Sequence, residues 1–424
     1  MDFIDLEYVP GKDDVIAEYY LEPRGISFEK ACNHIAGESS IGTWTDVKTM
    51  KPRIAKRLKP TVFYIRKKEK IIRIAYPLDL FEPGSVPQLM SSIGGNIFGM
   101  KVLRNLRLLD IHFPKKYVLS FKGPKFGIPG IRRVFHIRKR PLLGTIVKPK
   151  LGLNEREHAK SAYEAWVGGI DIVKDDENLT NMRFNRFEKR VLETLKMRDK
   201  AENETGEGKF YMPNITSETG EMIKRAEFVK KNGGEYVMVD IVSVGWSALQ
   251  TLRELNDGLN LIIHAHRAGH AAFTKNPKHG ISMLVVAKLS RLIGVDQIHV
   301  GTAKVGKMGG EGTEEIEDEI ESKFIPEFEG SHLLEQFWFH IKPVFAVASG
   351  GLHPGSIPKL IEKMGTNIII QAGGGVHGHP GGTRAGAKAM RQALESVMKG
   401  VPLEEYAKER KELAQAIKKW GIAK

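Results

Sequence analysis

The sequence has one cysteine, Cys32, among its 424 residues. Intrachain disulfides and thiolate metal clusters need at least two cysteines, so neither can stabilise this chain. No apolar run approaches the roughly 20 residues that a membrane-spanning helix needs, and the N-terminus lacks the basic-then-apolar pattern of a secretion signal. These absences predict a soluble, cytoplasmic protein without a membrane partner. Its 41% of hydrophobic residues are enough for an ordinary core.

The chain carries a formal net charge of +14. Its basic residues are scattered among acidic ones instead of forming one block, which predicts that nucleic acid is not a partner. A surface rich in Lys and Glu, of the kind found in thermophile proteins, explains the charge. Attraction of a polyanionic small substrate, such as a sugar phosphate, is a second explanation.

Residues 1–125 have the pattern of a mixed α+β domain. Strand-like runs lie near 2–8, 15–22, 61–66, 71–76 and 105–112, and helical spacing lies near 27–36 and 86–94. The stretch 121–140 is rich in Gly, Pro and Arg, and it predicts a linker over 126–140.

Residues 141–402 repeat a short apolar run followed by helical spacing. The runs lie near 143–147, 170–173, 209–215, 236–241, 259–264, 295–300, 343–348 and 367–371. Eight strand–helix units in about 260 residues predict a closed (β/α)8 barrel, also called a TIM barrel, with a doubly wound open sheet as the alternative. Residues 403–424 are expected to form an amphipathic helix outside it.

One stretch organises the functional interpretation: Gly168-Gly-Ile-Asp-Ile-Val-Lys174-Asp-Asp-Glu177. Its apolar part reads as a buried parallel strand. Because side chains alternate along a strand, Lys174 and Asp176 should point the same way, and Glu177 can turn toward them from the loop. An amine and two carboxylates then meet at the carboxyl end of a strand, where barrels place their chemistry.

The residues alone leave several interpretations of this cluster open. It can be a strand-end salt bridge or a solvated charge run. Two carboxylates also suit Mg²⁺, which binds few carboxylates and several waters. An ammonium opposes a cation, so Lys174 fits a metal site only as a counter-ion or after losing its charge. Reaction of the neutral amine with CO2 would give a carbamate, a negatively charged oxygen ligand.

Polar or glycine-rich residues follow most of the other strand-like runs. They are Lys148-Pro149-Lys150, Asn214, His264-Ala265-His266-Arg267, His299, Ser349-Gly350-Gly351 and Gly373-Gly374-Gly375. In a barrel these ends meet on one rim, so their joint occurrence predicts an active site there. Bare backbone N–H groups in the glycine runs would suit a phosphate. The loop at 301–310 has the composition of a lid, although a plain flexible connector is the alternative.

Six motifs carry a family resemblance. They are Gly144-Thr-Ile-Val-Lys148-Pro-Lys150-Leu-Gly, Gly169-Ile-Asp-Ile-Val-Lys174-Asp-Asp-Glu177, His264-Ala-His266-Arg267, His299 with the loop that carries Lys307, Ser349-Gly-Gly and Gly373-Gly-Gly. Together they resemble the large subunit of ribulose-1,5-bisphosphate carboxylase/oxygenase (RuBisCO) over essentially the whole chain. Gly-Glu-Ser-Ser-Ile-Gly-Thr-Trp and Gly-Gly-Gly-Val-His-Gly-His-Pro are most similar to the archaeal form III enzymes.

The resemblance implies an enzyme that carboxylates, and also oxygenates, ribulose 1,5-bisphosphate and yields 3-phosphoglycerate. It implies that CO2 carbamylates Lys174, that Mg²⁺ binds to Lys174, Asp176 and Glu177, and that the carbamate forms a Mg-bound enediolate. It implies catalytic roles for Lys148, His266 and Lys307. It implies substrate-binding roles for Glu38, Thr43, Trp44, Asn96, Lys150, Arg267, His299, Ser349, Gly350, Gly351, Gln371, Gly373 and Gly374.

The resemblance also implies a homo-oligomer of dimers with shared active sites. Glu38, Thr43, Trp44 and Asn96 would reach the site from the partner subunit. No small subunit is implied, and in the archaeal form the substrate would come from AMP and nucleoside salvage.

The sequence departs from the family at a few positions. Ile146 stands where plant-type enzymes have Thr, Gly269 replaces a usual Met, and Gly309 stands where many members have Glu in a lid that is one residue longer. The alternative function is a RuBisCO-like enolase or isomerase acting on a phosphorylated sugar. Such relatives usually lose several of the residues present here, among them Glu38, Arg267 and Lys307.

Overall fold

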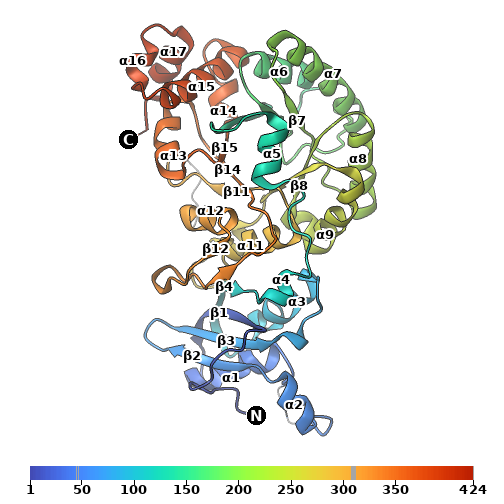
Figure 1. The fold of residues 1–424 in the computed structure, drawn as a ribbon, viewed down its shortest axis with the longest axis vertical. Helices are drawn as coiled ribbons and strands as arrows, with labels where there is room; N and C mark the ends of the chain where they lie inside the picture. Colours follow the sequence, from blue (N-terminus) through green and yellow to red (C-terminus); the bar gives the residue numbers. More distant parts are fainter. Residues whose placement is uncertain (44, 46, 307–311, 424) are drawn as a thin grey trace. The chain divides into compact units, whose positions relative to one another are not determined.

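The computed structural model describes residues 1–43, 45, 47–306 and 312–423 (Figure 1). Trp44 and Lys307, two of the expected site residues, lie outside the described residues. The chain divides into two compact units: Met1–Gly123 with Gly269–Gly294 and Ser322–Ile341, and Pro124–Ala268 with Val295–Glu321 and Lys342–Lys424. None of the helices in the described part of the chain is both long and apolar enough to cross a membrane.

The first unit contains a five-stranded sheet in the order β10-β4-β1-β3-β2. Its strands are β1 (Asp14–Pro23), β2 (Thr61–Arg66), β3 (Ile71–Pro77), β4 (Leu103–His112) and β10 (Gly280–Ile281). The strand-like run expected near residues 2–8 forms only an isolated bridge from Ile4 to Val62. Leu6 and Val9 are exposed there, so little apolar burial favours a longer strand.

Helices and a small hairpin complete the first unit. They are α1 (Phe28–Glu38), α2 (Pro52–Leu58), α3 (Val86–Ile93), α4 (Lys115–Val118), α10 (Ala271–Thr274), α11 (Met283–Ile293), β12 (Phe324–Ile325) and β13 (Gln336–Phe337). Helix α2 was not expected from the sequence, because it buries none of its residues and so has no apolar stripe.

The second unit is built on eight parallel strands in the order β7-β6-β5-β15-β14-β11-β9-β8. They are β5 (Leu142–Ile146), β6 (Ile172–Lys174), β7 (Phe210–Met212), β8 (Tyr236–Asp240), β9 (Ile262–His266), β11 (Gln297–Gly301), β14 (Phe345–Ser349) and β15 (Ile368–Gln371). A parallel bridge from Asn214 to Met238 joins the two ends of this order. The strands therefore close into a barrel. This confirms the predicted fold class and excludes the alternative of a doubly wound open sheet.

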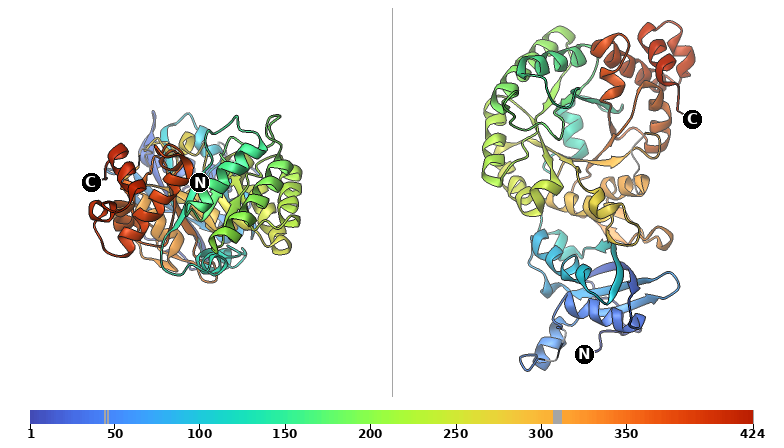
Figure 2. Two further views of the ribbon diagram at one scale, coloured as in Figure 1. Left: turned by 90° about the horizontal axis from the view of Figure 1, so that it is seen from above. Right: turned by 180° about the vertical axis from the view of Figure 1, so that it is seen from behind.

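Helices follow the strands and surround them in the second unit (Figure 2). They are α6 (Glu155–Val167), α7 (Phe187–Thr205), α8 (Thr219–Lys231), α9 (Ile241–Leu259), α12 (Thr313–Glu321), α13 (Ile357–Met364), α14 (Gly374–His377) and α15 (Gly382–Met398). Where one helix was expected over 403–424, the chain forms α16 (Leu403–Ala407) and α17 (Lys411–Trp420). Extended backbone at Arg410 separates the two.

Residues 126–140, the expected linker, contain the helix α5 (Gly127–Phe135). Ile128, Ile131 and Phe135 share one buried face and join a cluster with the first residues of several barrel strands, among them Phe210 and Tyr236. The rings of Phe135 and Phe210 lie 3.8 Å apart between centroids. Helix α5 thus packs against the amino ends of the strands and leaves their carboxyl ends for the site.

Candidate active site at the carboxyl ends of the barrel strands

Lys174 is the last residue of β6, and its side chain is only 1% exposed. Its Nζ donates to the carbonyl oxygen of Asp175 at 2.9 Å and lies 3.2 Å from Sδ of Met238 on β8. Burial lowers the pKa of Lys174, while the charges of Glu177 and Asp176 oppose that shift. The environment therefore favours the neutral amine more than solvent does.

Asp176 and Glu177 each pair with a lysine from the segment after β5. Nζ of Lys148 lies 2.6 Å from Oδ2 of Asp176, and Nζ of Lys150 lies 2.9 Å from Oε1 of Glu177. Burial raises the pKa of Glu177, but the Lys150 hydrogen bond and the charge of Lys174 bring it down to about 2. Glu177 is therefore an anion at neutral pH.

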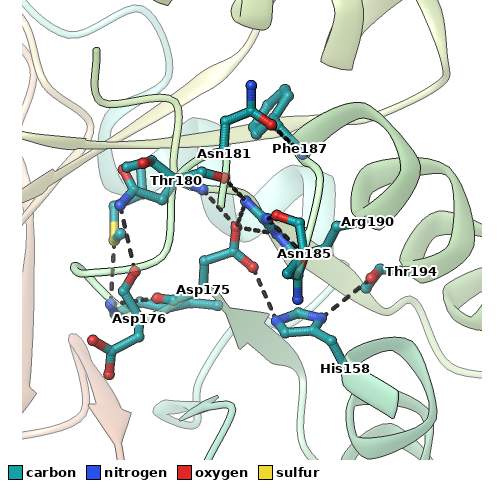
Figure 3. Close-up of polar contacts among 12 residues, drawn as sticks. His158, Asp175, Asp176, Thr180, Asn181, Asn185, Phe187, Arg190 and Thr194 are labelled. Atoms are coloured by element: carbon teal, nitrogen blue, oxygen red, sulfur yellow. Dashed lines mark hydrogen bonds and ion pairs between the residues drawn. The ribbon is translucent and has the colours of Figure 1, made fainter. Parts of the chain in front are cut away.

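The carboxylates of Asp175 and Asp176 point to opposite sides of the chain (Figure 3). Asp176 faces Lys148. Asp175 instead reaches Arg190 on α7 and His158 on α6, between the strands and the helices. Asp176 therefore lies with the candidate site residues, whereas Asp175, on the opposite side of the chain, holds the loop after β6.

A cluster of histidines lies at the ends of β9 and β11. Nδ1 of His266 is 2.9 Å from Oδ1 of Asp240, and its Nε2 is 3.8 Å from Oε2 of Glu177. Nε2 of His299 is 2.9 Å from Nε2 of His264. Burial lowers the pKa of all three histidines, so each favours its neutral form.

Strand β15 lies between β14 and β5. Gln371 pairs in register with Ser349 on one side and Gly144 on the other. Both polar atoms of the Gln371 side chain are buried without a hydrogen-bond partner among the described residues. A Cβ added at Gly373 would lie 2.8 Å from Cε of Lys148, so glycine lets the lysine side chain pass.

The beginning of the predicted lid loop packs closely on the β14 end. A Cβ added at Gly306 would lie 2.2 Å from the carbonyl oxygen of Gly350, and the Gly306 N–H donates to Oγ1 of Thr302. Arg267, beside this segment, is 8% exposed. Gly351 is exposed, and a Cβ at Gly374 would meet open space.

Three expected site residues lie in the first unit. Glu38, Thr43 and Asn96 are all exposed there. Glu38 and Thr43 line a cavity of about 470 Å³ together with His34 and Gly42. The remaining expected residues that the structure describes, from Lys148 to Gly374, all belong to the second unit.

Sequence reasoning missed Asp240, which ends β8 and whose Oδ1 lies 2.9 Å from Nδ1 of His266. The rule that polar residues at strand ends face the rim would have found it. Sequence reasoning also missed the partners of Asp175, which come from three different elements. No spacing in the sequence relates Arg190 to Tyr211 or to His158.

The candidate metal ligands are Lys174, Asp176 and Glu177. Among residues 1–43, 45, 47–306 and 312–423, no group of three His, Cys, Asp or Glu side chains is arranged to hold a metal ion. Asp176 and Glu177 would supply two oxygen ligands, and a carbamate on Lys174 would supply a third. This all-oxygen donor set fits Mg²⁺.

Comparisons with known proteins cover both units. Residues 127–420 match the family model of the ribulose bisphosphate carboxylase large chain, catalytic domain, and residues 2–117 match its N-terminal domain. The chain is 56% identical to the ribulose bisphosphate carboxylase of Pyrococcus abyssi, over 100% of this chain and 97% of that one. It is 53% identical to that of Methanosarcina mazei, over 99% of both.

Solved structures give the same result. The dimeric archaeal RuBisCO of Hyperthermus butylicus has a TM-score of 0.94 at 48% identity, over 99% of this chain and 98% of that one. The octameric RuBisCO of Pyrococcus horikoshii has a TM-score of 0.92 at 53% identity, over 100% and 97%.

Proposed function

Because this chain belongs to the family of ribulose bisphosphate carboxylase large chains and is therefore a lyase, we propose that its carboxylation of ribulose 1,5-bisphosphate uses a carbamate on Lys174 and Mg²⁺. The observation that carries this proposal is the buried amine of Lys174, whose pKa is lowered by burial beside the charges of Glu177 and Asp176. The products are two molecules of 3-phosphoglycerate, and O2 competes with CO2.

Burial prepares Lys174 for CO2. A neutral amine attacks the carbon of CO2, forms an N–C bond and releases a proton. In water most lysine side chains carry a charge at neutral pH, so a lowered pKa increases the reactive fraction. The carbamate adds a negative charge to a buried site, which needs compensating cations. The ammonium groups of Lys148 and Lys150 lie beside the two carboxylates and supply part of this compensation.

We assign Mg²⁺ to Asp176, Glu177 and the carbamylated Lys174. When bound, Mg²⁺ supplies Lewis-acid stabilisation of the developing enolate charge. Lys174 would hold the carbamate that serves as base for the C3 proton of the substrate. Lys148 returns a proton to the carbon skeleton, and Lys307 holds the incoming carboxylate.

His266 assists proton transfer at the substrate hydroxyls. Nδ1 of His266 lies 2.9 Å from Oδ1 of Asp240 and accepts from the N–H of Ala268 at 3.2 Å, while Nε2 lies 3.8 Å from Oε2 of Glu177. These contacts at both ring nitrogens hold the orientation of the imidazole.

The substrate has two phosphates, and two sets of residues are assigned to them. Arg267 and His299 bind one phosphate. Gly373 and Gly374 bind the other with backbone N–H groups, together with Thr43 and Trp44 of the partner subunit. The remaining assigned contacts to substrate oxygens come from Lys150, Ser349, Gly350, Gly351 and Gln371, and from Glu38 and Asn96 of the partner subunit. The two unpartnered polar atoms of Gln371 support its place here.

We infer a homo-oligomer built from dimers with shared sites and no small subunit. Relatives in dimeric and octameric form support this assembly. The protein acts in the cytoplasm on ribulose bisphosphate derived from AMP and nucleoside salvage. The alternative of an enolase or isomerase is not favoured, because relatives at 45–56% identity over nearly the whole chain are named carboxylases.

A product assay tests the proposal. The protein is incubated with labelled bicarbonate, Mg²⁺ and ribulose 1,5-bisphosphate, with the Lys174→Met variant as the control. We expect acid-stable label in 3-phosphoglycerate with the unmodified chain and none with the variant. Unlabelled product from the unmodified chain would reject carboxylation, and undiminished turnover by Lys174→Met would reject the carbamate.

A further inference from the structure

Two buried aspartates flank the three residues of β6. Asp175 follows Lys174 directly, and none of its surface is exposed. Its Oδ1 accepts from the hydroxyl of Tyr211 at 2.7 Å and lies 3.1 Å from Nε2 of His158. Its Oδ2 accepts from Nε of Arg190 at 3.1 Å and from the N–H of Asn214 at 2.9 Å. One carboxylate therefore joins β6 to α6, to α7 and to the segment that begins at β7.

The contacts continue from Asp175 to the candidate metal ligands. Asn214, whose N–H is held by Asp175, donates from Nδ2 to the carbonyl oxygens of Asp176 at 3.4 Å and Glu177 at 3.1 Å. Arg190 donates from Nη2 to the carbonyl of Thr180 at 2.8 Å and from Nη1 to Oδ1 of Asn185 at 2.9 Å. The backbone after β6 is thus held at several points by Arg190 and Asn214, and Figure 3 shows Arg190 beside Thr180 and Asn185.

We propose that Asp175, with Arg190 and Tyr211, is a positioning residue that holds Lys174, Asp176 and Glu177 ready for CO2 and Mg²⁺. This inference rests on the proposed function, because it assumes that those three residues bind the metal. Asp175 contacts Arg190, Tyr211 and His158 and is not one of the proposed metal ligands. Its fixed position lowers the conformational entropy that the three ligands lose when the carbamate and the cation bind. Loss of the Asp175 contacts should therefore weaken activation more than it slows the chemistry.

The other end of β6 offers a matched control. Asp171, which is also buried, accepts two hydrogen bonds of 2.7 Å from Arg140 and one of 2.8 Å from the N–H of Leu143. Both aspartates are buried, both pair with arginine, and both adjoin the same strand. Only Asp175 lies next to the site. Asp171→Asn should therefore lower stability as Asp175→Asn does, without changing activation.

The test measures the carbamate and turnover separately. ¹³C NMR follows the carbamate signal in full-length protein given ¹³CO2, while Mg²⁺ is titrated. For Asp175→Asn, the Mg²⁺ concentration at half-maximal carbamate should rise about 10- to 100-fold, as is typical when groups that orient metal ligands are lost. Turnover at saturating CO2 and Mg²⁺ should stay within about threefold of the unmodified chain. Asp171→Asn should show the unmodified midpoint and a lower melting temperature.

A milder variant covers the case in which Asp175→Asn does not fold. Tyr211→Phe removes one hydrogen bond to Asp175 and should raise the same midpoint about two- to tenfold. An unchanged midpoint in Tyr211→Phe and in any folded Asp175→Asn would overturn the inference. So would an equal shift in Asp171→Asn, or a loss of turnover with no shift in midpoint. Absence of a carbamate signal in the unmodified protein would instead refute the proposed function itself.

Discussion

Nζ of Lys148 lies 2.6 Å from Oδ2 of Asp176, across the carboxyl ends of β5 and β6. Lys150 pairs in the same way with Glu177 at 2.9 Å. Each carboxylate proposed to bind Mg²⁺ therefore already has an ammonium partner. Under the proposed function, a divalent cation would have to compete with these two lysines, which are also proposed to act on the substrate.

Replacement of Lys148 should separate metal binding from catalysis. In Lys148→Met, Asp176 loses its competing ammonium, so the Mg²⁺ affinity in CO2-saturated buffer should rise. Turnover should fall about 100-fold or more, because a positioned proton donor is lost. Calorimetric titration with Mg²⁺ and a product assay measure the two effects. Lys359→Met, which removes a surface partner of Glu362, is the control, and weaker Mg²⁺ binding by Lys148→Met would refute the competition.

Carbamylation should depend on pH in a defined direction. Burial lowers the pKa of Lys174 from its usual 10.5, and only the unprotonated amine reacts with CO2. At a fixed concentration of dissolved CO2, the initial rate of activation should therefore rise with pH and level off above the lowered pKa. The midpoint should lie below that of a solvent-exposed lysine. A rate of activation that decreases as pH rises would contradict this account.

Helix α12 contains a carboxyl group that should make stability depend on pH. Burial and the nearby Glu321, Asp318 and Glu314 raise the pKa of Glu317 from 4.5 to about 9. The folded state therefore holds a proton that the unfolded state has released, and stability declines as pH rises from about 4.5 to about 9. The Glu317→Gln side chain needs no proton, so at pH 8 this variant should have a higher melting temperature than the unmodified chain. The increase should be about 2–4 °C for each kcal/mol gained in the free energy of unfolding.

The control for Glu317 is Glu404→Gln on α16, where the side chain is exposed. This control should keep the melting curve of the unmodified chain at every pH. The measurement is thermal unfolding at several pH values. If Glu317→Gln melted lower than the unmodified chain at pH 8, Glu317 would be a stabilising anion, contrary to the raised pKa.

Phe135 on α5 should contribute to stability and not to catalysis. It is 4% exposed and packs on Phe210 at the amino end of β7. Phe135→Ala should cost about 3–5 kcal/mol, the usual range for a large buried aromatic side chain. Turnover of the folded variant at moderate temperature should stay near that of the unmodified chain. A selective loss of turnover without a loss of stability would show that α5 influences the site.

Shared active sites can be tested by mixing inactive chains. Glu38→Gln and Lys174→Met would each be inactive alone, but a hybrid dimer would contain one site with both native residues. After subunit exchange at equal amounts, about a quarter of the sites should be intact if dimers are symmetric and pair at random. Activity should reappear in that proportion. No recovery, with hybrids present by native mass spectrometry, would mean that each site lies within one chain.

The barrel was predictable because its signal repeats. Each strand is a short apolar run, and the eight barrel strands lie within a few residues of the predicted runs. Side-chain alternation also predicts that Lys174 and Asp176 face the same way, and this stays a prediction. Helix α5 was not predicted, because the Gly and Pro of its segment suggested a linker. Pro129 lies in the first turn of α5, where no backbone donor is needed, and the spacing of Ile128, Ile131 and Phe135 was the available signal.

The site was predictable only in part. The sequence identified residues that end strands, but it could not show what those residues touch. The pairing of Lys148 with Asp176 and the contact of Asp240 with His266 depend on how neighbouring strands are staggered. From the sequence alone, Asp175 could not be distinguished from the other acidic residues of the charged run 174–177. Its role depends on partners in α6, α7 and β7, which come together only after the barrel closes.

The most direct test of the account is a structure determined with bicarbonate and Mg²⁺. We predict density that extends beyond Nζ of Lys174 and a cation that contacts this group, Asp176 and Glu177. A bare Lys174 amine, with the cation absent from these residues at saturating Mg²⁺, would contradict it.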